Sequence, residues 1–152
     1  MITGIISLRL IVALCLGMII GLERIYSGHD AGIRTHGIMS LGSALFIVLA
    51  ISSAVEFNAG YSEVVRTIGQ IVTGVGFLGG GLIFVSNRDN HKKGLTSAAT
   101  LWTTSAIGIA CGFGYFGIAI LTTVLVMFSL TIMGNLEWAI LKVLGKYEQN
   151  KQ

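Results

Sequence analysis

Apolar runs long enough to cross a membrane alternate with short charged segments along this chain. A membrane-spanning helix needs about 20 predominantly apolar residues. Stretches without a charged residue occupy positions 35–55, 67–87 and 94–136, and a further apolar run covers positions 5–21 with a single arginine near its start. The 94–136 stretch is too long for one span, and two glycines within 112–115 divide it, because glycine lowers helix propensity. The pattern therefore indicates five apolar helices.

We predict an all-α integral membrane protein that folds as a bundle of five transmembrane helices. The helices are expected at about residues 5–22, 36–55, 66–86, 96–112 and 115–140. They form one transmembrane domain, residues 1–145, which leaves a short cytoplasmic tail, residues 146–152. The composition agrees, because 53% of the residues are hydrophobic and only 11% are charged, whereas an average soluble domain has about 25% charged residues.

The positive charges predict how the bundle is oriented. Cytoplasmic loops of membrane proteins are enriched in lysine and arginine. If the N-terminus lies outside, eight of the 10 Lys and Arg residues fall in cytoplasmic segments, and only Arg9 and Arg66 fall on the other side. The first residues lack a positive n-region, and no cleavage site follows the first apolar run, so this helix is expected to remain in the mature protein. We expect the N-terminus outside and the C-terminus in the cytoplasm.

Pairs of glycines spaced four residues apart predict close contacts between helices. Such spacing lets two helix backbones approach each other inside a membrane. The pairs are Gly17 with Gly21, Gly76 with Gly80, and Gly108 with Gly112. The third expected helix holds five glycines within positions 74–81, which leaves two interpretations open. The glycines either serve close packing, or they break the helix locally so that its backbone groups face an ion.

Polar residues recur at helical spacing on three of the expected helices. They are His36, Ser40 and Ser43 on the second, Arg66, Gln70 and Thr73 on the third, and Thr96, Thr100 and Thr103 on the fourth. Residues at i, i+4 and i+7 lie on one face of a helix, and polar groups inside a bilayer are costly unless they find partners. We therefore expect the stripe on the third helix to face the bundle interior. The stripes line a polar track, or their hydroxyls only bond to carbonyls of their own helix.

Ionisable residues are dense between the first two expected helices. The segment 23–36 contains Glu23, Arg24, Asp30, Arg34 and His36. Opposite charges that pair around a glycine turn would explain the segment structurally. The functional alternative is a site for an anion, a lipid headgroup or a hydrated divalent cation, for which Glu23 and Asp30 are weak candidate metal ligands.

Arg9 lies inside the first apolar run and has three interpretations. Its side chain extends outward to the membrane surface, pairs with Glu56 or Glu63, or faces a ligand. Elsewhere, no zinc helix, phosphate loop or catalytic triad is present in the sequence. We therefore expect neither catalysis nor a bound cofactor. The net charge of +3 does not indicate nucleic-acid binding, because its cations flank the predicted spans.

Four ordered blocks stand out in the sequence: residues 21–24, residues 31–36, Arg66 with residues 70–79, and residues 94–102. Together these blocks resemble the MgtC/SapB family of bacterial inner-membrane proteins. Departures are small, at Gly80 and Ser97, where the family often has Ala and Thr. The resemblance implies a multi-pass, five-helix domain in the bacterial inner membrane. Many members append a soluble cytoplasmic domain, and here only the short tail is expected to follow.

The resemblance also implies a setting for the function. Family members are linked with adaptation to low magnesium and, in pathogens, with survival inside host cells. We hypothesise a regulatory or adaptor module that acts through another membrane protein or an anionic lipid within the bilayer, and we expect a homo-oligomer. The alternative is a Mg²⁺-linked transporter or channel-like protein that uses a polar track between its helices.

Overall fold

The fold was analysed in a computed structural model that describes residues 2–58, 60–86, 93–133, 136 and 140. All secondary structure in these residues is helical. The elements are α1 (Ile2–Tyr26), α2 (Ile33–Glu56), α3 (Tyr61–Ser86), α4 (Lys93–Phe113), α5 (Phe116–Phe128) and the π-helical turn η2 (Ser129–Met133). The predicted all-α class is confirmed.

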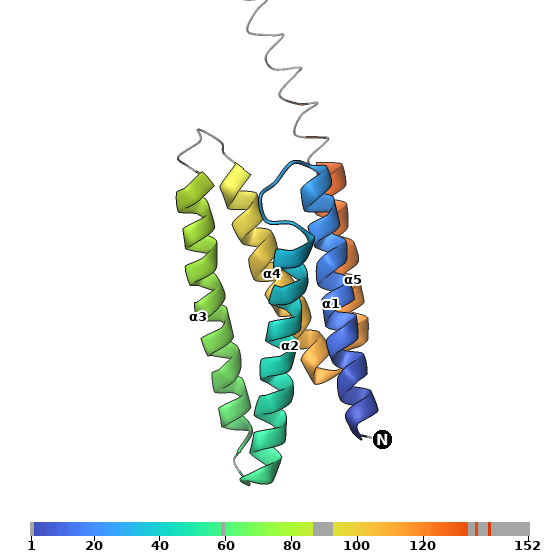
Figure 1. The fold of residues 1–152 in the computed structure, drawn as a ribbon, viewed down its shortest axis with the longest axis vertical. Coiled ribbons are helices and arrows are strands. Elements are labelled where there is room, and N and C mark those ends of the chain that lie inside the picture. Colours follow the sequence, from blue (N-terminus) through green and yellow to red (C-terminus); the bar gives the residue numbers. More distant parts are fainter. Residues whose placement is uncertain (1, 59, 87–92, 134–135, 137–139, 141–152) are drawn as a thin grey trace, which may run out of the picture.

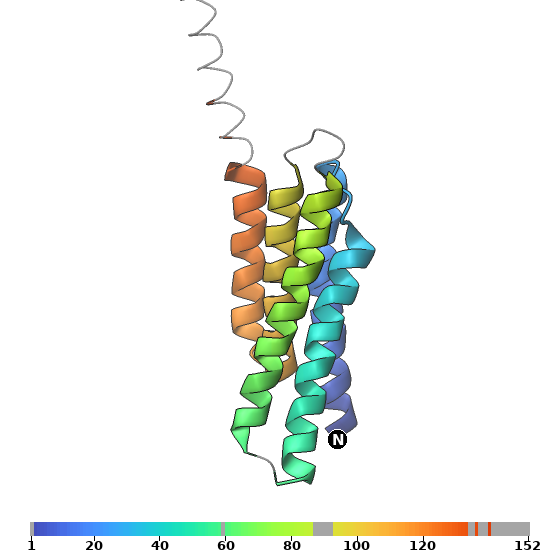
Figure 2. The same cartoon turned by 90° about the vertical axis from the view of Figure 1, so that its left-hand side faces the viewer.

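The helices run up and down along one bundle axis (Figure 1). Helices α1, α2 and α4 contact one another and form the centre. Helix α5 packs on α1 and α4, whereas α3 packs on α4 and, more loosely, on α2. Helix α3 therefore lies at the edge of the bundle (Figure 1) and in front of the other helices when this side faces the viewer (Figure 2). We call the end that carries the α1–α2 connection, residues 27–32, the loop end. The other end carries the N-terminus and the α2–α3 turn (Figure 1).

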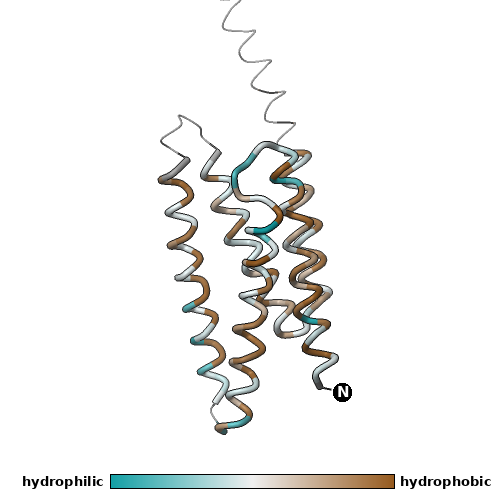
Figure 3. Tube along the Cα trace, in the orientation of Figure 1, coloured by the Kyte–Doolittle hydropathy of each residue, from teal (hydrophilic) through white to brown (hydrophobic). Residues whose placement is uncertain are grey.

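Three of the helices are long and apolar enough to cross a membrane. They cover Thr3–Tyr26, Ile33–Glu56 and Tyr61–Phe84, and a shorter apolar helix covers Phe116–Ile132. Apolar residues predominate along these segments (Figure 3). Helix α4 is 21 residues long but richer in Ser, Thr and Gly. The structure thus supports a membrane protein, while the count of five spans and their orientation stay predictions.

The helices extend beyond most of their predicted ends. Helix α1 continues to Tyr26 and α2 starts at Ile33, so the segment 23–36 is mostly helical rather than a loop. Helix α3 is continuous through its glycines, and the interpretation that they break this helix is wrong. The predicted end of the fifth helix at 140 is reached only by isolated described residues, and the tail 146–152 lies outside the described part of the chain.

Four glycines bring the backbones of the central helices together. A Cβ atom added at Gly17 would lie 2.5 Å from the His36 carbonyl oxygen, and one at Gly21 would lie 2.6 Å from that of Gly32. On α4, a Cβ at Gly108 would lie 2.2 Å from the Ser40 oxygen, and one at Gly112 would lie 2.8 Å from that of Ala44. These glycine pairs are confirmed as helix contacts of α1 and α4 with α2.

The pair on α3 behaves differently. A Cβ atom at Gly76 or Gly80 would have no other atom within 4 Å, and both residues are exposed. The prediction that this pair packs against another helix is therefore wrong within the chain. The reason is the peripheral position of α3, which contacts its neighbours through a different face, where Val64, Val75 and Gly79 are buried. A contact between two copies of the chain is not tested by this geometry.

Among the described residues Arg9 forms no ion pair with Glu56 or Glu63, and its side chain contacts the end of α4 instead. Its Nη1 donates a hydrogen bond of 2.9 Å to the carbonyl oxygen of Gly112, in the last turn of α4. Its guanidinium also lies against Gly114, which adopts a φ of +85° as α4 ends. A cation at a helix C-terminus is favoured, because the last carbonyl groups carry partial negative charge. Arg9 therefore anchors the end of α4 to α1.

Candidate functional site

A buried charged cluster lies at the loop end of α1. Glu23 and Arg24 form an ion pair in which both side chains are less than a tenth exposed. The second carboxylate oxygen of Glu23 accepts a hydrogen bond of 2.6 Å from the Ser27 hydroxyl, and Arg24 Nη1 lies 3.4 Å from His29 Nε2. We call Glu23, Arg24, Ser27 and His29 the loop-end cluster. It forms because α1 continues into the predicted loop and the α1–α2 connection folds back over it.

The loop-end cluster leaves little capacity for a metal ion. Both oxygens of the Glu23 carboxylate already have partners, and Asp30, the other candidate ligand, is exposed. No group of three or more His, Cys, Asp or Glu side chains is placed to hold a metal ion among the residues that the structure describes. Hydrated Mg²⁺ prefers carboxylate oxygens, so the cluster resembles an internal ion pair more than a cation site.

A line of polar contacts joins α2 to α4 beneath this cluster. His36 is fully buried, and its Nδ1 lies 3.1 Å from the Gly32 carbonyl oxygen. Its Nε2 lies 3.3 Å from Thr100 Oγ1. Two turns further along, Ser43 Oγ lies 2.8 Å from Ser105 Oγ. We call His36, Ser43, Thr100 and Ser105 the α2–α4 polar line.

The polar line does not continue through the bundle. Beyond Ser43, buried apolar residues fill the centre, including Ala44, Ile47, Ile107 and Cys111. The glycine contacts at the same interface bring the backbones of α2 and α4 together, so side chains and backbone occupy the space that water would need. The α2–α4 polar line therefore ends near the middle of the bundle.

The predicted stripe on α3 does not join this interior. The side chain of Arg66 is 73% exposed and forms an ion pair of 2.5 Å with Glu63 on the same helix. Gln70 and Thr73 are also exposed, and the Thr73 hydroxyl donates to the carbonyl of Gly69, one turn earlier. The expectation that the stripe faces the bundle interior is wrong, because α3 turns its apolar side toward α4.

The remaining candidates divide between the interior and the surface. Thr100 is buried, whereas Thr96 and Arg34 are exposed. Sequence reasoning overlooked the hydroxyls of Ser27, Thr104 and Ser105 and the imidazole of His29. The signal for one of them was present, since Thr104 lies four residues before Gly108 and continues the spacing of the glycine pair toward Thr100. No pattern in the sequence indicated that Ser27 and His29 would fold back on Glu23 and Arg24.

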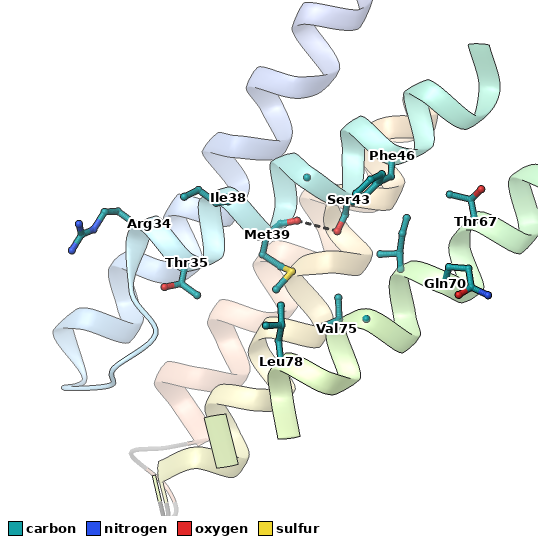
Figure 4. Close-up of a pocket in the computed structure, with 13 residues that line it drawn as sticks. Arg34, Thr35, Ile38, Met39, Ser43, Phe46, Thr67, Gln70, Val75 and Leu78 are labelled. Carbon is teal, nitrogen blue, oxygen red and sulfur yellow. Dashed lines mark hydrogen bonds between the residues drawn. The ribbon is translucent and has the colours of Figure 1, made fainter. Parts of the chain in front are cut away.

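A groove of about 890 Å³ separates α2 from α3. Its middle is apolar, with Met39, Phe46, Val75 and Leu78 facing one another across it (Figure 4). Thr67 and Gln70 lie at one end, and Arg34 and Thr35 lie at the other (Figure 4). The exposure of Ile38, Phe46 and Leu78 shows that the groove opens on the side of the bundle. We call it the α2–α3 groove.

Comparisons with known proteins place the chain within a family. Residues 10–138 match the MgtC family. Protein MgtC of Brucella abortus is 41% identical over 115 residues, which is 76% of this chain and 45% of that protein. Protein MgtC of Salmonella typhimurium is 36% identical over 79% of this chain and 48% of its own length. Protein SrpB of Synechococcus elongatus is 35% identical over 83% of this chain and 73% of its own length.

The chain spans about half the length of the MgtC proteins it matches, 45% and 48% of the two above. No solved structure matches it. The likeness covers α1 to α5, including the loop-end cluster and both walls of the α2–α3 groove.

Proposed function

Because the chain belongs to the MgtC family of membrane proteins, we propose that it is a regulatory or adaptor module in Mg²⁺ homeostasis and stress adaptation. The setting follows from the family resemblance, which links members with low magnesium. The module would act in the bilayer of a bacterial inner membrane, through another membrane protein, an anionic lipid or a second copy of itself. The proposal includes no catalytic role.

The closed interior carries this proposal. A Mg²⁺ pathway needs oxygen ligands and retained water along the bundle axis. Here the Glu23 carboxylate is occupied by Arg24 and Ser27. Backbone contacts of Gly108 with Ser40 and of Gly112 with Ala44 close the α2–α4 interface beside the polar line and just beyond it. The features that remain available to ligands lie on the sides of the bundle, which is where a regulatory module meets its membrane partners.

We place the N-terminus outside and the loop end in the cytoplasm, with five spans. The bias of Lys and Arg supports this orientation, and α4, with its 21 residues, is about 32 Å long, comparable with the hydrocarbon core of about 30 Å. In intact cells, a cysteine probe at Asn58 in the α2–α3 turn should be labelled from outside, and one at Asn150 should be protected. The reverse pattern would reject the orientation.

The exposed face of α3 is the surface we assign to protein partners, including a second copy of the chain. Gly76 and Gly80 leave open space on it, and Phe77 beside them is 83% exposed. Small residues allow close approach between membrane helices. In a bacterium that lacks its own copy, the chain should restore growth at low Mg²⁺. Gly76→Leu should lose this ability while staying folded, whereas the matched control Gly117→Leu, at an open position of α5, should keep it.

Transport is the second candidate, and one observation favours it. The α2–α4 polar line places four polar side chains deep in the bundle, and Ser40 Oγ, which is buried beside it, has no hydrogen-bond partner among the described residues. Purified protein in liposomes with an internal Mg²⁺ indicator separates the two functions. We expect no flux above protein-free liposomes. Flux that Ser43→Val abolishes and the exposed control Thr131→Val leaves unchanged would establish transport and overturn the regulatory proposal.

A further inference from the structure

The α2–α3 groove has the form of a one-chain lipid site. Its central lining is apolar, and no side chain fills it at Gly42 or Gly74, where an added Cβ would meet nothing within 4 Å. The volume of about 890 Å³ falls within the range of small-molecule sites, about 300–1,000 Å³. Because α3 packs mainly on α4, the groove is a consequence of the fold and not of one side-chain position.

The two ends of the groove differ in charge. Arg34 is exposed at the loop end, next to Thr35, and its guanidinium extends outward from the groove (Figure 4). Within the described residues Arg34 forms no ion pair, although Asp30 lies only four residues earlier. An unpaired arginine at a membrane surface favours a phosphate group, and basic pockets between membrane helices bind anionic headgroups.

The length of the apolar section matches one leaflet. From Arg34 to Phe46 the helix advances about 18 Å at 1.5 Å per residue, and half of the hydrocarbon core is about 15 Å. Gln70 lies 16 residues before the end of α3 at Ser86, which places it about 24 Å from the loop end. An acyl chain that starts at Arg34 would therefore run along the apolar middle of the groove toward the end that Thr67 and Gln70 line.

We propose that the α2–α3 groove binds an acyl chain of an anionic phospholipid whose phosphate is held by Arg34. The chain lies between Met39 and Phe46 on α2 and Val75 and Leu78 on α3. The regulatory meaning of this site rests on the proposed function. A lipid in the groove would couple the spacing of α2 and α3 to the lipid composition of the membrane.

Native mass spectrometry of the purified full chain tests the binding. The probes are phosphatidylglycerol and phosphatidylcholine with identical acyl chains. We expect half-maximal binding of phosphatidylglycerol at a concentration about fivefold lower, the ratio for one arginine near a membrane surface. Arg34→Gln should abolish the difference, whereas Arg66→Gln, which removes an exposed arginine at the other end of the bundle, should preserve it. Equal binding of the two lipids, or equal effects of the two substitutions, would overturn the proposal.

The acyl chain has its own test. Gly42→Leu and Gly74→Leu fill the groove from either wall and should reduce retention of both lipids about tenfold, while Gly117→Leu on α5 should not. Displacement of phosphatidylglycerol by inorganic phosphate at equal concentration would show headgroup binding alone and overturn the assignment of the groove. For wild-type protein, a phosphatidylglycerol with a photoreactive group on its acyl chain should label Met39, Phe46 and Val75. Labelling spread evenly over α1 and α5 would contradict the proposal without any variant.

These results separate the two proposals. Loss of the lipid preference without Mg²⁺ flux would remove the lipid site and leave the regulatory function. Mg²⁺ flux through a chain that still prefers phosphatidylglycerol would remove the regulatory function and leave the lipid site.

Discussion

Replacing Gly108 by alanine should destabilise the bundle, although alanine is the better helix former. The new Cβ would lie 2.2 Å from the Ser40 carbonyl oxygen and 2.9 Å from its carbonyl carbon. These are backbone atoms, so no rotamer change relieves the clash, and α4 must move away from α2. Overpacking of this kind costs about 1–3 kcal/mol, which exceeds the gain of up to about 1 kcal/mol in helix propensity.

Gly76→Ala is the matched control on a different face. Nothing lies within 4 Å of its added Cβ, so only the propensity gain remains and the variant should be as stable as the wild type or up to about 1 kcal/mol more stable. The two substitutions are chemically identical and both lie within apolar helices, and the structure predicts opposite signs for them.

Thermal unfolding in a mild detergent measures the difference. Each kcal/mol corresponds to roughly 2–4 °C in Tm for a chain of this length. Widening of the α2–α4 interface also separates His36 from Thr100, which adds to the loss. A Gly108→Ala protein that melts with or above the wild type would refute the backbone contact between α2 and α4. A destabilised Gly76→Ala protein would show instead that the α3 face is packed in the detergent-solubilised oligomer.

Three further predictions follow from the buried contacts. Glu23→Gln should lower the free energy of unfolding by about 3–5 kcal/mol, because it removes the partner of a buried cation. Glu63→Gln should lower it by less than about 1 kcal/mol, because its ion pair is exposed. Chemical unfolding of the two variants measures both values. Thr100→Val should lower stability by about 1 kcal/mol through the lost contact with the α2 imidazole, and Thr103→Val should not, as the same assay would show. Arg9→Leu should fray the end of α4, so amide exchange there should rise severalfold over the wild type.

The sequence predicted the central helices well because small residues recur on them at a single spacing. Gly17 and Gly21 on α1 and Gly108 and Gly112 on α4 lie against α2, as their four-residue spacing indicates. On α2, His36, Ser40 and Ser43 are all buried. In these helices the polar or small face and the packed face coincide, so one pattern was sufficient to orient them.

The rotation of α4 was predicted only in part. Two series of hydroxyl residues at helical spacing share Thr100 on this helix: positions 96, 100 and 103, and positions 97, 100 and 104. The structure buries Ser97, Thr100 and Thr104. The two faces differ by less than a third of a turn, which hydroxyl spacing alone does not distinguish. The glycine pair on the same helix favours the second series, because Thr104 lies four residues before Gly108.

Helical spacing rules do not predict the Glu23–Arg24 ion pair. Adjacent residues on a helix point about 100° apart, and pairing rules consider the third and fourth neighbours. The pair forms because the α1–α2 connection buries both side chains at once, a tertiary effect with no local signature. The sequence located the charged residues but assigned them to a loop.

The prediction for helix α3 was wrong about the direction in which its polar residues face, although the physical premise behind it holds. Polar groups in a membrane need partners, and Arg66 and Thr73 find theirs on their own helix, at Glu63 and at Gly69. Gln70 has no hydrogen-bond partner among the described residues, so its cost within the bilayer is not offset by them. The requirement that predicted an interior position would be met equally well by a second copy of the chain on the exposed glycine face. A single sequence does not distinguish these two environments, because the same residues satisfy both.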